Sequence, residues 1–173
     1  MKVSQNLWLE RMNNLLERRK AGAITSQFKH VDDYKGHINK CYVGKTVLDV
    51  GCGSMTIKSC LPQETEYTGI DPFPVSDEVI KMNIEECDFP DNTFETLYAF
   101  AMLDNLYDLP KAVEQMKRVC TNNIVILTGV NIPPDKYHTI EIKKEELAEL
   151  MNPFKIGYIE YLHPKIMLIE FLR

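Results

Sequence analysis

One stretch of the sequence, residues 47–53 (VLDVGCG), constrains the fold of this chain more than any other. Residues 46–50 are β-branched or apolar apart from Asp49, so they predict a buried strand, and that strand runs directly into a pair of glycines. Glycine lets the backbone turn sharply and lets a ligand approach it closely. The pattern predicts a strand and a tight turn in an α/β sheet, although an ordinary left-handed turn would need the same glycines.

Expected strands and helices alternate along most of the chain. Further strands are expected at residues 67–70, 79–84, 94–101, 123–128, 156–162 and 166–172, and helices at 3–20, 31–39, 56–61, 109–120 and 143–151. The connection at residues 72–78 is too short for a full crossover helix, so that helix must be vestigial or replaced by a loop. Residues 163–165 are short enough for a hairpin, which makes the last two strands antiparallel.

These elements predict a single α/β domain over residues 1–173. A helical arm, residues 1–40, would precede a core, residues 45–173. The core is expected to be an open, mostly parallel seven-stranded sheet with helices on both faces and a C-terminal antiparallel β-hairpin.

Composition and charge narrow the function classes. The first ten residues lack an apolar segment, and no run approaches the roughly 20 apolar residues of a membrane span, so we expect a cytoplasmic protein. The five cysteines are scattered without the spacing of a zinc site, which predicts reduced thiols and no metal. Residues 1–45 carry a net charge of +5 and the rest −10, which argues against a general nucleic-acid binder and leaves a local basic arm.

A second acid, Asp71, follows the strand expected at 67–70. A carboxylate at the end of that strand can hold both ribose hydroxyls of a nucleoside, although an acid before Pro72 is also a common turn residue. A dinucleotide and S-adenosylmethionine both fit a glycine turn with such an acid. The dinucleotide fingerprint needs a third glycine, which residues 54–56 lack, and Asp49 suits an amino group better than a pyrophosphate. The balance favours S-adenosylmethionine.

Residues 46–128 as a whole resemble the class I, or Rossmann-like, S-adenosylmethionine-dependent methyltransferases, especially the group with a small methyltransferase domain. Residues 47–53 are similar to the first motif of that family and residues 67–71 to the second. Residues 83–95 resemble its adenine-side loop, residues 97–106 its fourth-strand motif, and the expected final hairpin its last two strands. The resemblance implies a Rossmann-like fold with S-adenosylmethionine, or its product S-adenosylhomocysteine, as cofactor.

The resemblance also implies a set of cofactor-binding residues. The glycine turn and the end of the fourth strand would line the methionine and sulfonium end, Asp71 the ribose, and the segment after the third strand the adenine. The complete set is Asp49, Gly51, Cys52, Gly53, Asp71, Pro72, Asn83, Ile84, Phe100, Ala101 and Met102. The sequence departs from the family where Met55 replaces a usual third glycine, where Asn83 replaces a common Asp, and in the near absence of a helix after Asp71.

No catalytic residue can be named from the sequence. Methyl transfer from a sulfonium depends mainly on proximity and alignment, and the candidates near the acceptor, His138, Tyr137 and Tyr107, are equally well interpreted as surface or packing residues. The fourth strand has no signature for a nucleic-acid base, so a small molecule or a short peptide is the favoured acceptor. Two alternatives remain: a non-catalytic S-adenosylmethionine- or adenosine-binding module that acts through a partner, and a nucleotide-dependent oxidoreductase.

The N-terminal arm is the remaining feature with a functional interpretation. It carries the single tryptophan, Trp8, and the basic run at residues 18–20. We expect the arm to pack over the acceptor side of the pocket and to place positive charge there. The competing interpretation is a fixed helix that shields the sheet.

Overall fold

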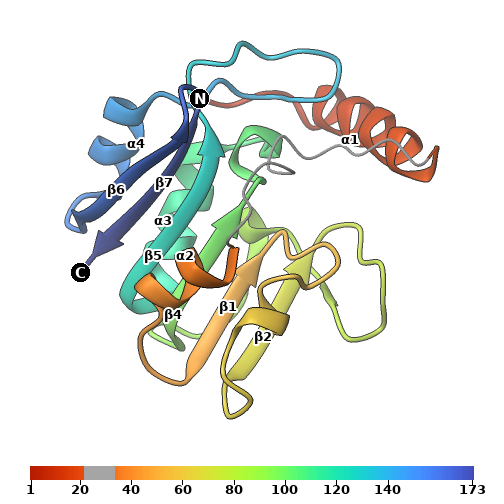
Figure 1. Ribbon diagram of the computed structural model, residues 1–173. Helices are drawn as coiled ribbons and strands as arrows, with labels where there is room; N and C mark the ends of the chain where they lie inside the picture. The colour runs from red at the N-terminus through yellow and green to blue at the C-terminus, as the bar shows by residue number, and fades with distance from the viewer. Residues whose placement is uncertain (22–33) are drawn as a thin grey trace.

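An open sheet of seven strands organises the part of the chain that the computed structural model describes, residues 1–21 and 34–173. Its strands lie in the order β3-β2-β1-β4-β5-β7-β6 (Figure 1). Their bounds are β1 Thr46–Val50, β2 Glu66–Asp71, β3 Ile80–Lys81, β4 Phe94–Phe100, β5 Cys120–Gly129, β6 Lys155–His163 and β7 Ile166–Leu172. Strands β1 to β5 pair in parallel, whereas β7 is antiparallel to both β5 and β6. The predicted fold class, including the C-terminal hairpin, is confirmed.

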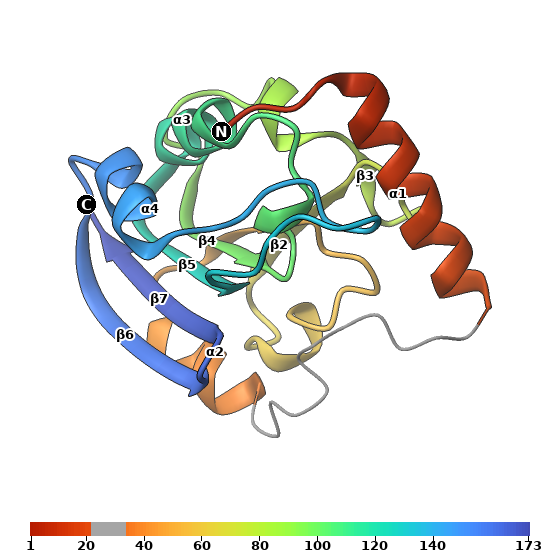
Figure 2. The ribbon, with the colours of Figure 1, turned by 90° about the horizontal axis from the view of Figure 1, so that it is seen from above.

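Helices cover both faces of this sheet. Helices α3 (Leu109–Val119) and α4 (Lys144–Met151) lie on one face and α2 (Tyr34–Cys41) on the other, while α1 (Gln5–Lys20) lies beyond the ends of the parallel strands (Figures 1 and 2). Helix α3 begins where the Asp108 side chain accepts a hydrogen bond from the Lys111 backbone N–H, with a proline in its first turn. In the described chain, the short 3-10 helices η2 (Lys58–Cys60) and η3 (Ile84–Glu86) lie between strands, and η4 (Leu103–Asn105) lies between β4 and α3.

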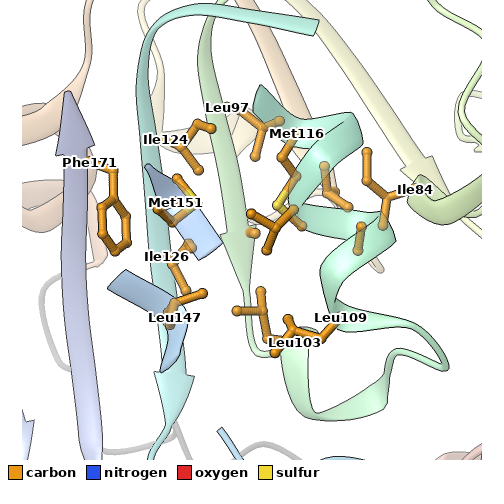
Figure 3. Packing of buried hydrophobic residues seen from close by; sticks show 14 of the residues in the cluster. Ile84, Leu97, Leu103, Leu109, Met116, Ile124, Ile126, Leu147, Met151 and Phe171 are labelled. Atoms are coloured by element: carbon orange, nitrogen blue, oxygen red, sulfur yellow. The ribbon is translucent and has the colours of Figure 1, made fainter. Parts of the chain in front are cut away.

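The core has two layers because the central strands are buried on both faces. Figure 3 shows the layer between the sheet and helices α3 and α4, a single buried cluster that includes Leu97 of β4, Met116 of α3 and Leu147 of α4. The second layer, against α2, includes Ile38 and Tyr98. Burial on both faces explains why the central stretches of these strands, residues 97–100 in β4 and residues 124–127 in β5, are wholly apolar.

The N-terminal segment before α1 is tied to the loop before α3. The Val3 backbone N–H donates to the Tyr107 carbonyl at 2.8 Å, and the Leu109 N–H donates to the Met1 carbonyl at 3.1 Å. Lys2 Nζ lies 2.9 Å from a carboxylate oxygen of Asp108. These contacts anchor the start of α1 to the core.

Three expected elements differ in the structure. The strand expected at 79–84 is only Ile80–Lys81, because the chain turns away from this sheet edge and forms η3 from Ile84. The helix expected at 56–61 is the single turn of η2, which ends before Pro62. The helix expected at 31–39 is described from Tyr34 and extends to Cys41, while residues 22–33, including the expected start of this helix, lie outside the described residues. No helix stands between β2 and β3 in the described chain, as predicted.

A buried asparagine in β5 generates the first prediction. Asn123 accepts a hydrogen bond from the Thr96 hydroxyl and donates to the Cys41 carbonyl and to Glu170, so it joins α2 to three strands. Replacement Asn123→Leu leaves these partners unsatisfied, and we expect the free energy of unfolding to fall by about 2–4 kcal/mol in denaturant titrations. The adjacent exposed residue provides the matched control, since Asn122→Leu should change it by less than about 0.5 kcal/mol. Equal effects of the two variants would contradict the prediction.

Candidate functional site

Helix α1 lies across the carboxyl ends of β1, β2 and β4 (Figure 2). A pocket lies there, lined by residues of these strand ends and of α1. This is where open α/β sheets bind their ligands. The residues that line it are Trp8, Met12, Leu15, Leu16, Val50, Gly51, Asp71, Pro72, Phe73, Met82, Asn83, Ile84, Glu85, Ala101, Met102, Asn105 and Leu106. A second groove beyond Trp8 and Phe73 shares Pro72, Met82 and Asn83 with it.

The glycine turn forms the floor of the pocket. The backbone N–H groups of Gly51 and Cys52 both donate to the Ile70 carbonyl, at 2.8 and 3.1 Å, which fixes the turn against β2. Gly51 has φ +69°, and a Cβ atom there would lie 2.7 Å from Cβ of Met102. Only glycine therefore allows Met102 to approach the turn this closely. Met55 also has a positive φ, +57°, so the backbone takes the left-handed conformation that a glycine adopts most easily.

Asp71, at the end of β2, directs a nearly buried carboxylate to the pocket, with 7% of the residue exposed. One of its oxygens accepts a hydrogen bond from the Gly53 N–H at 3.1 Å and the other from the Phe73 N–H at 2.8 Å. Gly53 thus supports the acid although it does not line the pocket. A carboxylate has about four acceptor sites, so these bonds orient Asp71 and are compatible with hydrogen bonds to hydroxyl groups of a ligand.

Asp49 and Cys52 lie elsewhere. The Asp49 side chain accepts a hydrogen bond from the Tyr67 hydroxyl at 2.6 Å, and neither Asp49 nor Cys52 is among the residues that line the pocket. Cys52 packs over Gly69, where a Cβ atom would lie 2.8 Å from its sulfur. Burial, partly offset by the Tyr67 hydrogen bond and reinforced by the charge of Asp71, raises the pKa of the Asp49 carboxyl to about 7. Burial likewise raises the pKa of the Cys52 thiol, which keeps it neutral.

The wall after β3 and the end of β4 complete the base of the pocket. Asn83 and Ile84 line it at the start of η3, and the buried Glu85 accepts a hydrogen bond from the Tyr107 N–H at 3.0 Å. Burial raises the pKa of Glu85. Ala101, with φ +55°, turns the chain after β4 and brings Met102 to the pocket. Phe100, by contrast, packs edge-to-face on Tyr98 with ring centroids 5.6 Å apart and does not line the pocket.

Helix α1 covers the pocket with an apolar face. Trp8, Met12 and Leu15 are buried in one cluster with Tyr107. The Trp8 ring stacks on Phe73 with centroids 5.8 Å apart and meets Tyr107 edge-on at 5.7 Å. Its indole N–H donates to the Asn105 carbonyl at 2.7 Å.

A neighbouring face of α1 contacts the loop after β5. Arg11 donates to the His138 carbonyl at 2.5 Å, Asn14 donates to the Lys136 carbonyl at 3.2 Å, and the Arg18 guanidinium lies 4.7 Å from the centre of the Tyr137 ring. These contacts close the arm against the core.

The prediction that the basic run at residues 18–20 places positive charge at the pocket is wrong for Arg18 and Lys20, the two residues of the run whose side chains the structure describes. Arg18 is directed at Tyr137, and Lys20 pairs with Glu17 at 2.7 Å on the surface. The side chain of Arg19 lies outside the described residues. The face of α1 that meets the pocket is apolar because its inward positions, spaced three and four residues apart, carry large hydrophobic side chains.

The candidate acceptor-side residues from the sequence do not line the pocket. His138 contacts Asp135 at 2.8 Å and lies 4.0 Å from Asp104, and Tyr107 donates its hydroxyl to Glu86 at 3.0 Å. Sequence reasoning missed Phe73, Met82, Glu85, Asn105 and Leu106. The first three adjoin residues that had been named, so their position in the chain was a usable signal. Asn105 and Leu106 lie within the segment 97–106 that resembles the fourth-strand motif, but that resemblance named site residues only at its start.

A family model described as a methyltransferase domain matches residues 6–151. Among curated proteins no match is found. Within residues 1–21 and 34–173, no helix is long and apolar enough to cross a membrane, and no three His, Cys, Asp or Glu side chains are grouped to hold a metal ion.

Solved structures share the fold at low sequence identity. A SAM-dependent methyltransferase from Aquifex aeolicus is 15% identical with a TM-score of 0.67, covering 91% of this chain and 97% of its own. The 1,6-didemethyltoxoflavin-N1-methyltransferase of Burkholderia thailandensis, crystallised with 1,6-didemethyltoxoflavin and S-adenosylhomocysteine, is 14% identical with a TM-score of 0.73, covering 94% and 86%. A putative methyltransferase in complex with the Trm112 activator of Haloferax volcanii is 12% identical with a TM-score of 0.71, covering 94% and 96%.

The buried carboxyl of Asp49 generates a pH prediction. Its folded pKa of about 7 exceeds the unfolded value, so the folded state binds the proton more tightly and the contribution of Asp49 to stability is lost as the pH rises from about 4 to 7. The replacement Asp49→Asn keeps an acceptor for the Tyr67 hydroxyl without a charge. We expect the stability of this variant relative to wild type to increase by the order of a few kcal/mol between about pH 4.5 and about pH 8, as measured by denaturant titration. A difference independent of pH would show that the Asp49 pKa is ordinary.

Proposed function

The chain belongs to the methyltransferase-domain family, whose cofactor is S-adenosylmethionine, and we propose that it transfers the methyl group of this cofactor to a small molecule or a short peptide. The observation that carries the proposal is the Asp71 carboxylate, which faces the same pocket as Gly51 and Ile84. A pocket with an acid at one strand end, a close-approach glycine at the next and an apolar wall suits a nucleoside that carries an amino-acid chain.

The pocket residues suit S-adenosylmethionine part by part. Asp71 would hold the ribose hydroxyls, and Asn83, with the Ile84 backbone N–H, would face the adenine. Gly51 has no side chain, which would let the methionine end lie close to its backbone. A side chain there would also collide with Met102, which borders the same part of the pocket. Ala101 and Met102 would border the sulfonium. Pro72, which also lines the pocket, would contact the cofactor. Four further residues lie behind the pocket surface and would support it without touching the cofactor: Asp49, Cys52, Gly53 and Phe100.

The contribution of the chain to the reaction is position and shielding. When bound, the cofactor supplies a methyl group that is already activated by the positive sulfur. Trp8, Met12 and Leu15 of α1 exclude water from the pocket with their apolar side chains. The fixed turn at Ala101 sets the distance between the end of β4 and the glycine turn. Alignment of this kind can account for a large part of a rate enhancement, and we assign no general base.

The alternative of a non-catalytic module depends on Met55, which replaces the usual third glycine. Met55 adopts a left-handed φ of +57°, so the turn keeps the backbone conformation that a glycine would give it. This observation supports an active enzyme over a decayed site. Calorimetric titration with S-adenosylmethionine, S-adenosylhomocysteine and NAD distinguishes the candidate functions, since tight binding of NAD alone favours an oxidoreductase. A screen with a labelled methyl donor then separates the remaining two. Binding of S-adenosylmethionine without methyl transfer favours the non-catalytic module.

Removal of the Asp71 carboxylate tests the cofactor assignment. We expect Asp71→Ala to weaken S-adenosylhomocysteine binding at least about tenfold in calorimetry, since hydrogen bonds to a charged group contribute roughly 1.5–3 kcal/mol. Because Asp71 also orients the Gly53 and Phe73 backbone, Asp71→Asn serves as a milder second variant. Asp77→Ala, in the exposed part of the same loop, is the matched control and should bind as wild type does. Wild-type affinity in a folded Asp71→Ala protein would contradict the assignment.

The cover formed by α1 should respond to the cofactor. A lid must open to admit a ligand, so amide exchange of residues 7–16 is expected to slow when S-adenosylhomocysteine is added. Exchange in β5, which is buried, provides the internal reference. Equal and strong protection of α1 in both states would identify it as a fixed structural helix.

A further inference from the structure

One buried polar atom in the pocket has no partner. The side-chain oxygen of Asn105, Oδ1, is buried and lacks a hydrogen-bond partner among the described residues, and Asn105 lines the pocket. Native proteins leave few buried acceptors unsatisfied. A molecule in the pocket that donates a hydrogen bond would satisfy this oxygen, whereas an isosteric molecule without a donor would not.

The backbone around Asn105 is held in place, so its side chain is presented from a fixed position. The Asn105 N–H donates to the Met102 carbonyl at 2.9 Å, and its carbonyl accepts the Trp8 indole N–H at 2.7 Å. The Thr139 hydroxyl donates to the Leu106 carbonyl at 2.5 Å. The Trp8 indole and the Thr139 hydroxyl therefore donate to backbone carbonyls and not to Oδ1 of Asn105.

The surroundings of Asn105 in the pocket favour an uncharged ligand. Trp8, Met12, Leu15 and Leu106 supply aromatic and aliphatic walls. Among the described residues that line the pocket none is basic, and the charged ones, Asp71 and Glu85, are acids. An anionic acceptor would be repelled by these acids, and any unpaired charge is costly to bury among such walls.

We propose that the acceptor site takes an uncharged, mainly apolar ring compound that carries an N–H or O–H group, and that this group donates its hydrogen bond to Oδ1 of Asn105. The inference rests on the proposed function, because it assigns the substrate class of the same pocket. An amide oxygen accepts a hydrogen bond but is too weak a base to remove the proton. Asn105 is therefore a positioning residue, which orients the heteroatom of the acceptor.

A matched pair of probes tests this inference through binding rather than activity. Phenol has the donor, and anisole has a similar ring with the donor replaced by a methoxy group. Trp8 is the single tryptophan of the chain, so its fluorescence reports directly on the pocket wall. Titrations are made with S-adenosylhomocysteine present, so that it occupies the cofactor part of the pocket and the probes can bind only in the remaining acceptor part. We expect phenol to bind about two- to tenfold more tightly than anisole, in the range of a net neutral hydrogen bond.

Three variants separate recognition from structure. Asn105→Leu should abolish the preference for phenol, and Asn105→Asp, which keeps an acceptor oxygen, should retain it. Asn13→Leu makes the same change on the exposed face of α1 and should behave as wild type. Equal affinities for the two probes in wild type, failure of both to bind, or a persisting preference in Asn105→Leu would overturn the inference.

The same series distinguishes failure of the inference from failure of the proposed function. Calorimetry with S-adenosylhomocysteine precedes the probe titrations. If the product binds and the probes show no donor preference, only the role of Asn105 is wrong. If the product does not bind, the proposed function is wrong, and the probe titrations repeated on the ligand-free protein judge Asn105 by the same criteria.

Discussion

The carbonyl of Ile70 accepts hydrogen bonds from two successive backbone N–H groups, those of Gly51 and Cys52, and the site depends on this interaction. It joins the turn after β1 to the end of β2, so the floor of the pocket and the Asp71 carboxylate form one unit. The bond from the Gly53 N–H to Asp71 extends the same connection. Because Gly51 reaches these positions with a positive φ, the corner requires its glycine whatever ligand the pocket binds.

The fold was predictable where burial leaves a strong pattern in the sequence. Strands β4 and β5 are covered on both faces and therefore appear as apolar runs, and the short connection between β6 and β7 allows only a hairpin. The prediction was wrong at 79–84, where apolar residues belong to the pocket wall around Ile84 instead of a long strand. An apolar residue buried by a 3-10 turn cannot be distinguished by sequence from one buried in a strand.

The candidate site was predictable in outline, because strand ends of an open α/β sheet converge on one edge. The direction of individual side chains was not. Leu48 and Val50 point to one layer of the core, so Asp49 between them faces the other layer and meets Tyr67. Asn105 lies within the fourth-strand motif at residues 97–106, but the motif does not single it out, and its contact with Trp8 appears only when α1, distant in sequence, is placed beside it.

The backbone hydrogen bonds between Met1 or Val3 and the loop at residues 107–109 fix the N-terminal end of α1 to the core. Rotation about that end displaces each residue in proportion to its distance along the helix axis. An opening movement about that end would carry Leu16 farther than Trp8, and it would first have to break the contacts of Asn14 and Arg18 with residues 136 and 137. The aromatic contacts of Trp8 with Phe73 and Tyr107 lie near the fixed end, so the same movement would disturb them least.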